Sequence, residues 1–154
     1  MPEWGYSVEG LNPDKTAKVS GRELRISPKA ATEICRTIRG MKIGEAKKTL
    51  EDVVAMKRAV AYRRYKKEVS HKRLQERWHA GKYPVKAAEG ILRLLEELET
   101  NAEYKGLDPE KLRIIHAASQ RGMKVRKFIP RAFGRSSPHF NILTHVELVG
   151  YEAE

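Results

Sequence analysis

Hydrophobic residues recur along this chain with two different spacings, one typical of helices and one typical of strands. Helical spacing occurs from Pro28 to Gly40, over about residues 44–57 and over about residues 84–104. Alternating spacing occurs over residues 17–27, 112–120 and 141–151. These six segments predict an α+β fold in which three helices pack on a small antiparallel β-sheet.

The predicted helices carry their own end signals. Ser27 can cap the first helix, Pro28 suits its first position, and Gly40 can end it in the left-handed conformation. The predicted apolar stripes are Ala31, Ile34, Cys35 and Ile38; Ala46, Leu50, Val53 and Val54; and Ala88, Ile91, Leu95, Leu98 and Ala102. The inward strand candidates are Ala17, Val19, Leu24 and Ile26, then Ile142, Thr144, Val146 and Leu148, with Gly21 as a possible bulge or turn.

The composition narrows the class of partner. A chain of 154 residues is expected to form one domain, spanning 1–154, and its net charge of +11 implies a polyanion. Nucleic acid is the first expectation and an anionic membrane the second. No apolar stretch approaches the roughly 18 residues of a membrane span, and the N-terminus lacks a signal pattern, so we expect a cytoplasmic protein without a membrane partner. The single Cys35 excludes an internal disulfide and is expected to be a core residue.

The positive charge is concentrated in two segments. Residues 57–77 hold nine cations and two acids, and residues 121–135 hold six cations and no acid. These segments carry net charges of +7 and +6, so the rest of the chain is close to neutral. A globular body within about residues 12–120 and 141–151, nearly neutral outside residues 57–77, is therefore expected to carry two basic extensions.

The second basic segment lies between two predicted strands. A structureless loop of about twenty residues inside a compact domain is uncommon, so we expect the strands to continue as a long hairpin over about 121–140. Arms of roughly ten residues at about 3.3 Å each would reach about 33 Å. An isolated two-stranded ribbon is marginal in water, and its cations repel, so RNA phosphates and bases are the expected source of stability.

Other interpretations of the two segments stay open at this point. Residues 121–140 could be a flexible solvated loop, and residues 57–77 could be a solvated helix face. Tyr62 and Tyr65 lie among the cations of the latter segment and Trp78 directly follows it, which favours contact with nucleic acid.

Three motifs, in the same order, resemble those of one family. The stretch SPKAATEICRTIRGMKIGEAKKTLEDVV (27–54) is similar to the signature of large-subunit ribosomal protein L twenty-two. IPRAFGR (129–135) resembles the tip of that family's hairpin, and NILTHVELVGY (141–151) resembles its final strand. The chain departs from the bacterial pattern at Lys29, which is followed directly by two alanines, and at Ile129, where bacterial tips usually have Arg. A basic insertion over about 56–83 resembles the archaeal and eukaryotic branch.

The resemblance implies a structural constituent of the large ribosomal subunit. It implies binding to large-subunit (23S-type) rRNA beside other ribosomal proteins, and a hairpin whose tip helps to line the exit tunnel of the nascent polypeptide. The rRNA-binding residues so implied are Arg121, Lys124, Arg126, Lys127, Arg131, Arg135, His139, Lys57, Arg58, Arg63, Arg64, Lys66, Lys67, Lys72, Arg73, Arg77 and Lys29. The tunnel tip is Phe128, Ile129, Pro130, Arg131, Ala132, Phe133, Gly134 and Arg135. No DNA partner is expected.

The residues indicate no catalytic or metal chemistry. The five histidines lack metal-ligand spacing, no phosphate-binding glycine loop or nucleophile elbow occurs, and we expect neither an enzyme nor a cofactor. His116 and His145 lie on predicted strands and could face each other as a structural pair. Ser136 and Ser137 are expected to be turn residues. The alternative function is a general nucleic-acid-binding protein or RNA chaperone, which would carry a basic face rather than basic extensions.

Overall fold

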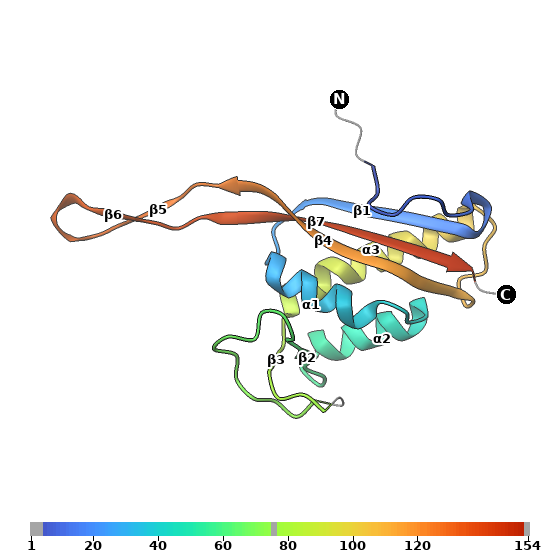
Figure 1. The fold of residues 1–154 in the computed structure, drawn as a ribbon, viewed down its shortest axis with the longest axis horizontal. Coiled ribbons are helices and arrows are strands. Elements are labelled where there is room, and N and C mark those ends of the chain that lie inside the picture. The colour runs from blue at the N-terminus through green and yellow to red at the C-terminus, as the bar shows by residue number, and fades with distance from the viewer. Residues whose placement is uncertain (1–4, 75–76, 153–154) are drawn as a thin grey trace.

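A three-stranded antiparallel sheet forms the centre of the fold (Figure 1). The computed structural model describes residues 5–74 and 77–152, so residues 1–4, 75–76 and 153–154 of the expected domain lie outside it. The strands are β1 (Thr16–Leu24), β4 (Leu112–Val125) and β7 (Asn141–Glu152), in the order β1-β7-β4. The last strand in sequence therefore occupies the middle of the sheet.

Three helices cover one face of this sheet, as the spacing of apolar residues predicts (Figure 1). They are α1 (Pro28–Ile38), α2 (Ile43–Val54) and α3 (Val85–Tyr104), and a short 3-10 turn, Pro13–Lys15, precedes β1. The α+β prediction is confirmed. The second helix ends before the predicted residue 57, because the chain turns at Met56, whose φ is +57°. Ser27 takes the N-cap position of α1 without a side-chain hydrogen bond to the helix.

The core lies between the helices and the inner face of the sheet. Its fully buried side chains include Ile34, Ile38, Leu95, Leu98, Ile114 and Leu148. Cys35 is also buried, and burial raises the pKa of its thiol to about 12. All of these residues except Ile114 are among the predicted helix stripes and inward strand positions, and Ile114 lies in a predicted strand, so hydrophobic spacing alone identified most of the core.

Alternate residues of the strands project to the outer face of the sheet, where the N-terminal residues lie. Glu147 projects there because its neighbours Val146 and Leu148 point into the core. Its Oε2 accepts hydrogen bonds from the backbone N–H (3.1 Å) and the hydroxyl (2.7 Å) of Ser7. The register places His116 opposite Val149 and His145 opposite Gln120. The expected facing of the two histidines is therefore wrong, because four residues of β7 separate their positions.

Irregularities in both outer strands meet at His145. Strand β1 shifts register between Gly21 and Leu24, and the Glu23 N–H within this bulge donates to His145 Nδ1 at 3.0 Å. Strand β4 shifts register between Arg121 and Lys124, and a Cβ at Gly122 would lie 2.8 Å from His145 Nε2. Since real contacts of this kind are longer, the imidazole can pack there only against glycine.

Beyond the bulges, β4 and β7 leave the body as a paired ribbon (Figure 1). Pairing runs out to Val125 with Asn141 and resumes in β5 (Phe128–Pro130) and β6 (Ser136–Pro138). A 3-10 turn, η2 (Ala132–Gly134), closes the tip. Residues 121–140 therefore form the predicted long hairpin rather than a structureless loop, and we call them the hairpin.

Residues 56–83 form the second extension, which we call the basic insertion. Two short strands, β2 (Val60–Ala61) and β3 (Gly81–Lys82), pair at its base. None of its described residues, 56–74 and 77–83, is helical. The interpretation of this segment as a solvated helix face is therefore wrong, because its shape comes from contacts with the body rather than from a helical repeat.

Candidate nucleic-acid interface

The hairpin presents its cations to solvent without acidic partners in its own sequence. All six predicted phosphate-binding residues are exposed, as is His139. The six are Arg121, Lys124, Arg126, Lys127, Arg131 and Arg135. Lys124 Nζ lies 5.5 Å from the centroid of the Phe140 ring, and Phe140 packs edge-to-face on Phe128 at 6.0 Å. These exposed ring contacts are the side-chain packing that the ribbon has in place of a core.

The tip of the hairpin holds an unusual backbone. Phe133 and Gly134 both have positive φ, +56° and +66°, and the Phe133 side chain is 99% exposed. A left-handed aromatic residue costs free energy that Gly134 avoids. The Arg131 N–H donates to the Arg135 carbonyl at 2.8 Å, which closes the tip. The chain thus presents a large aromatic side chain at its outermost turn.

Two serines follow the tip, and the expectation that they are turn residues is wrong. Ser136 and Ser137 belong to β6, where they pair with Pro130 and Ile129. The Ser137 hydroxyl accepts a hydrogen bond from Arg131 Nε at 3.2 Å. These serines belong to the ribbon because the turn itself is made three residues earlier.

The basic insertion is held against the body by buried groups. Glu33 of α1 is 1% exposed, and its Oε1 accepts hydrogen bonds from the backbone N–H groups of Arg64 (2.7 Å) and Tyr65 (2.9 Å). Trp78 Nε1 donates to the Tyr62 carbonyl at 2.9 Å, and Tyr62 is itself buried. Burial raises the pKa of Tyr62 to about 12, and the Glu33 charge adds to the rise.

Most predicted cations of the insertion point outward. Lys57, Arg63, Arg64, Lys66, Lys67, Lys72, Arg73 and Arg77 are exposed, and Arg58 is half-buried with its Nη1 donating to Thr49 Oγ1 at 3.2 Å. Several lie over rings: Arg63 and Lys66 over Trp78 at 5.2 and 5.5 Å, and Lys72 over Tyr83 at 5.8 Å. The aromatic residues of this segment therefore fix the directions of its cations.

Two grooves flank the beginning of α1, one toward each extension. The root groove, about 620 Å³, is lined by Arg25, Lys29, Lys86, Lys127 and Phe140 among others. The insertion groove, about 450 Å³, is lined by Lys29, Tyr62, Arg64, Tyr65, Lys67 and Lys82 among others. Lys29 belongs to both grooves, so the predicted cations of the hairpin root and of the insertion approach each other around it.

Three cations that line these grooves were not predicted from the sequence. Nor was the acid that holds one wall of the insertion groove in place. Arg25, Lys82 and Lys86 line the grooves, and Glu33 anchors the insertion. A signal existed for Lys86, as for Lys29, because each stands in the first turn of a helix that has no acid there. Cations are unfavourable beside the positive end of a helix, so lysines at two such places indicate an anionic partner.

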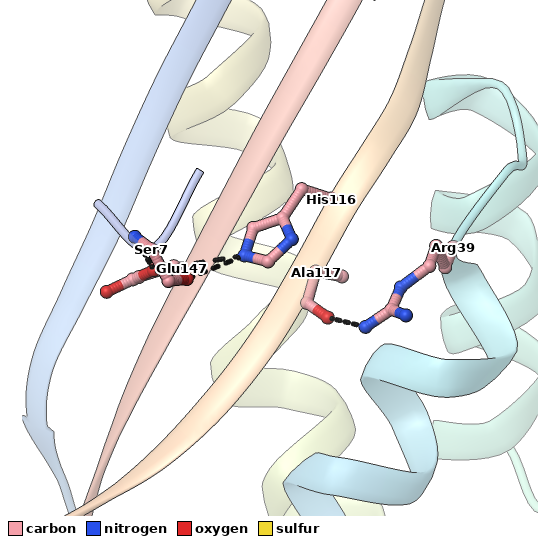
Figure 2. Close-up of polar contacts among 5 residues, drawn as sticks. All are labelled: Ser7, Arg39, His116, Ala117 and Glu147. Atoms are coloured by element: carbon pink, nitrogen blue, oxygen red, sulfur yellow. Dashed lines mark hydrogen bonds and ion pairs between the residues drawn. The ribbon is translucent and has the colours of Figure 1, made fainter. Parts of the chain in front are cut away.

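A second polar cluster lies on the outer face of the sheet and resembles a hydrolase triad only in composition (Figure 2). The Ser7 hydroxyl donates its one hydrogen to Glu147 Oε2, so its contact with His116 Nε2, at 3.0 Å, requires the imidazole to be the donor. His116 therefore cannot remove a proton from Ser7, and the arrangement lacks the order of a hydrolase triad, in which the imidazole accepts the hydroxyl hydrogen and the acid orients the imidazole. Burial and Arg39 lower the pKa of His116, whereas hydrogen bonds from Ser7 lower the pKa of Glu147 despite its burial.

A metal site is also absent from the described residues. Among residues 5–74 and 77–152, no three His, Cys, Asp or Glu side chains gather in a way that could hold a metal ion. His71 and His79 lie edge-to-face at 5.1 Å between ring centroids. Within the same described range, no helix is both long and apolar enough to cross a membrane.

Comparison with known proteins gives one consistent result. The family described as ribosomal protein L22p/L17e matches residues 19–150. The chain is 54% identical to the large ribosomal subunit protein uL22 of Archaeoglobus fulgidus, over 97% of this chain and 96% of that protein. It is 50% identical to the protein of the same name from Methanocaldococcus jannaschii, over 97% and 95% of the two chains. It is 48% identical to that of Thermofilum pendens over the full length of both.

Proposed function

The chain belongs to the ribosomal protein L22p/L17e family, in its archaeal-type form, and from this premise we propose that it binds large-subunit rRNA through its hairpin and basic insertion. As a member of this family it is a structural constituent of the large ribosomal subunit and not an enzyme. The proposal adds that the tip of the hairpin helps to line the exit tunnel of the nascent polypeptide.

The observation that carries the proposal is a protruding ribbon whose six cations are all exposed. A two-stranded ribbon without a core is marginal in water, and its like charges weaken it further. Phosphates of folded RNA would neutralise the charges, and exposed bases or sugars would cover Phe128 and Phe140. Arg side chains suit this role because their planar fork binds phosphate and stacks on bases.

The tip supports the second part of the proposal. Ile129 is 40% exposed, and Pro130 and Ala132 are also exposed. A channel wall for a passing peptide needs small or weakly adhesive groups and a fixed backbone. Pro130 and the closed turn at Arg131 supply the fixed backbone.

The partners proposed are large-subunit rRNA, neighbouring ribosomal proteins and, at the tip, the nascent polypeptide. A general nucleic-acid binder is the second candidate, because net charge alone would serve that function as well. Charge placement favours the ribosomal role, since the helices and sheet form a nearly neutral body and the cations gather on its extensions. A general binder would instead carry cations across one face of the fold.

Amide hydrogen exchange tests the proposal. It would be measured on the free protein and on the protein within purified large subunits. We expect residues 121–140 to exchange rapidly in the free protein and slowly in the particle, with residues 27–54 slow in both. Rapid exchange of the hairpin within the particle would contradict contact with rRNA.

Salt dependence provides a second test on isolated rRNA. If all six cations of 121–135 contact phosphates, the slope of log K against log salt should be on the order of −4 for single-strand-like RNA. The protein should also sediment with large subunits and leave them only at high salt. Equal affinity for any duplex of the same length would favour the general binder.

A further inference from the structure

The insertion groove combines charge and aromatic surface in a space of small-ligand size. Its volume of about 450 Å³ lies within the range of roughly 300–1,000 Å³ typical of such sites. Lys29, Arg64, Lys67 and Lys82 line it, and its lining includes no acidic residue. Four cations around one groove repel each other, so an anion bound there would stabilise the protein.

The cations gather around two tyrosine rings. Arg64 and Lys29 lie 5.6 and 5.9 Å from the centroid of the Tyr65 ring, and Lys82 lies 5.9 Å from that of Tyr62. Tyr62 is buried, whereas Tyr65 is half-buried and packs against the hydrophobic core with part of its surface still accessible. The accessible part of Tyr65, with the Arg64 guanidinium over it, is a flat surface on which a planar group can stack.

Glu33 holds this wall of the groove in place. Its buried Oε1 accepts the backbone N–H groups of both Arg64 and Tyr65, while its Oε2 is buried without a hydrogen-bond partner in the described structure. The wall is thus fixed before any ligand arrives, which lowers the entropy lost on binding. Glu33 acts through Arg64 and Tyr65 and is a positioning residue rather than a contact residue.

We propose that the insertion groove binds one unpaired RNA nucleotide, with the base stacked on Tyr65 and Arg64 and the phosphate held by Lys29, Lys67 and Lys82. This inference rests on the proposed rRNA-binding function. It specifies what the basic insertion, the second of the two proposed rRNA-binding segments, would recognise. A phosphate alone would use the cations but not the ring. A base within a duplex is already stacked and paired, so double-stranded RNA can contact the rim of the groove without entering it.

Binding of short RNAs to the full-length protein tests the proposal. Fluorescence anisotropy would compare an unpaired ten-nucleotide RNA with a duplex of the same length. We expect Tyr65→Leu, which leaves the charge unchanged, to weaken binding of the unpaired RNA about five- to tenfold and to leave the duplex unaffected. Tyr65→Phe should retain the wild-type affinity, because the ring remains.

Tyr104→Leu is the matched control. Tyr104 is 94% exposed at the far end of α3, so its loss should change neither affinity. A Tyr65→Leu protein that no longer folds, as judged by circular dichroism, would be replaced by Tyr65→Phe against Lys67→Gln. Lys67→Gln should then weaken binding of the unpaired RNA more than binding of the duplex, and Tyr65→Phe should weaken neither. Equal losses for the two RNAs would overturn the proposal.

Small probes test which part of the nucleotide is recognised. Nuclear magnetic resonance would follow the backbone amides of Arg64 and Tyr65 during titration with adenosine monophosphate, inorganic phosphate and an acidic decapeptide. Shifts with the nucleotide that phosphate and the peptide do not reproduce support the proposal. Equal shifts with phosphate, or tighter binding of the peptide, would overturn it.

The design separates this inference from the function on which it rests. If the wild-type protein binds neither RNA, the proposed function fails. If a change in the hairpin such as Arg126→Gln weakens RNA binding whereas Tyr65→Leu does not, the function stands and the insertion groove is not a nucleotide site.

Discussion

The hairpin and the basic insertion are both rich in Lys and Arg, but they are attached to the body in different ways. The hairpin continues two strands of the sheet, and from Arg126 to its tip no residue is buried. The insertion returns to the body, where Val60, Tyr62 and Ala80 are buried and Glu33 accepts two of its backbone N–H groups. The hairpin is therefore a continuation of two strands into solvent, whereas the insertion is a loop that packs against the body.

This difference shows that two segments of similar charge can differ in when they become ordered: before RNA binds, or only when it binds. The insertion is ordered by the body, so its cations and rings already have fixed places before RNA binds. The hairpin lacks such support, so RNA must supply both its neutralisation and its packing. We therefore expect changes in the insertion to affect folding and binding together, whereas changes in the hairpin affect binding alone.

The largest expected effect comes from shortening the hairpin. Replacing residues 126–139 by an Asn-Gly turn removes Arg126, Lys127, Arg131 and Arg135. If each contacts a phosphate, the salt slope should become less steep by about 3, and affinity for rRNA near physiological salt should fall on the order of 100-fold. Stability should change by no more than about 0.5 kcal/mol, because the removed residues bury no side chain. Filter binding over a salt series and urea denaturation would measure the two quantities.

The control for this change keeps the ribbon and removes only its charge. The same four cations changed to Gln should reproduce the altered slope with the hairpin length intact. A large loss of stability in the shortened protein would show that the hairpin supports the body, and the comparison between the two extensions would then fail.

The next effect is on the anchor of the insertion. Glu33→Ala leaves the backbone N–H groups of Arg64 and Tyr65 without their carboxylate, so we expect the free energy of unfolding to fall by about 3 kcal/mol. Urea denaturation would measure it. Glu89→Ala, at an exposed position on α3, is the matched loss of one acid and should cost less than about 0.5 kcal/mol. Equal results for the two variants would mean that Glu33 does not anchor the insertion.

The free energy of unfolding measured as a function of pH reports on the body alone, because His116 and Glu147 lie on the sheet and not in either extension. The pKa of His116 is lowered in the folded protein, so the unfolded chain takes up this proton first as pH falls below about 6.5, and stability declines. The pKa of Glu147 is also lowered, so its contribution is present above its ordinary value of 4.5 and is lost as pH falls further. We expect a decline below pH 6.5 that is smaller than the loss in Glu33→Ala.

The pH series has its own control. His116→Gln should flatten the decline between pH 7 and 5.5, and shortening the hairpin should leave it unchanged. A stability that rises on acidification to pH 5.5 would contradict the direction assigned to His116.

The smallest expected effect is at the tip. Phe133→Ala should change the free energy of unfolding by less than about 0.5 kcal/mol, because this side chain is 99% exposed. Tyr62→Ala, in the insertion, removes a buried ring and should cost about 3 kcal/mol. Thermal denaturation of the two variants would show whether an aromatic side chain in the hairpin contributes less to stability than one in the insertion.

Most of the fold could be predicted from local spacing. The stripes of α1 and α3 and the strands flanking the hairpin follow from periodicity, and the hairpin follows from the distance between two strands that must pair. The insertion could not be predicted in this way, because Glu33 lies about thirty residues before the amides it accepts. Its position beside Ala30 and Ile34 on an apolar helix face was the one local sign that an acid had a buried partner.

The prediction of site residues was similarly divided. Cations in uniform runs were easy to identify, and the structure places nearly all of them at the surface. The grooves around Lys29 depend on residues from several separate segments, among them Arg25, Lys82 and Lys86, which no run of charge marks. Lys29 and Lys86, in the first turns of α1 and α3, indicate an anion-binding groove only when these helix ends are known to lie beside the extensions.

The contact between Gly122 and His145 also has a mechanical consequence. It lies at the fixed end of a lever about 33 Å long, the reach of roughly ten extended residues. A tilt of about 10° at this point would move the far end of the lever by about 6 Å. A methyl group added at Gly122 would meet the His145 imidazole, far from the tip, and any tilt that this contact forces at the root would be amplified at the tip. The direction of the hairpin therefore depends on its root, where the imidazole of His145 packs against the backbone of Gly122.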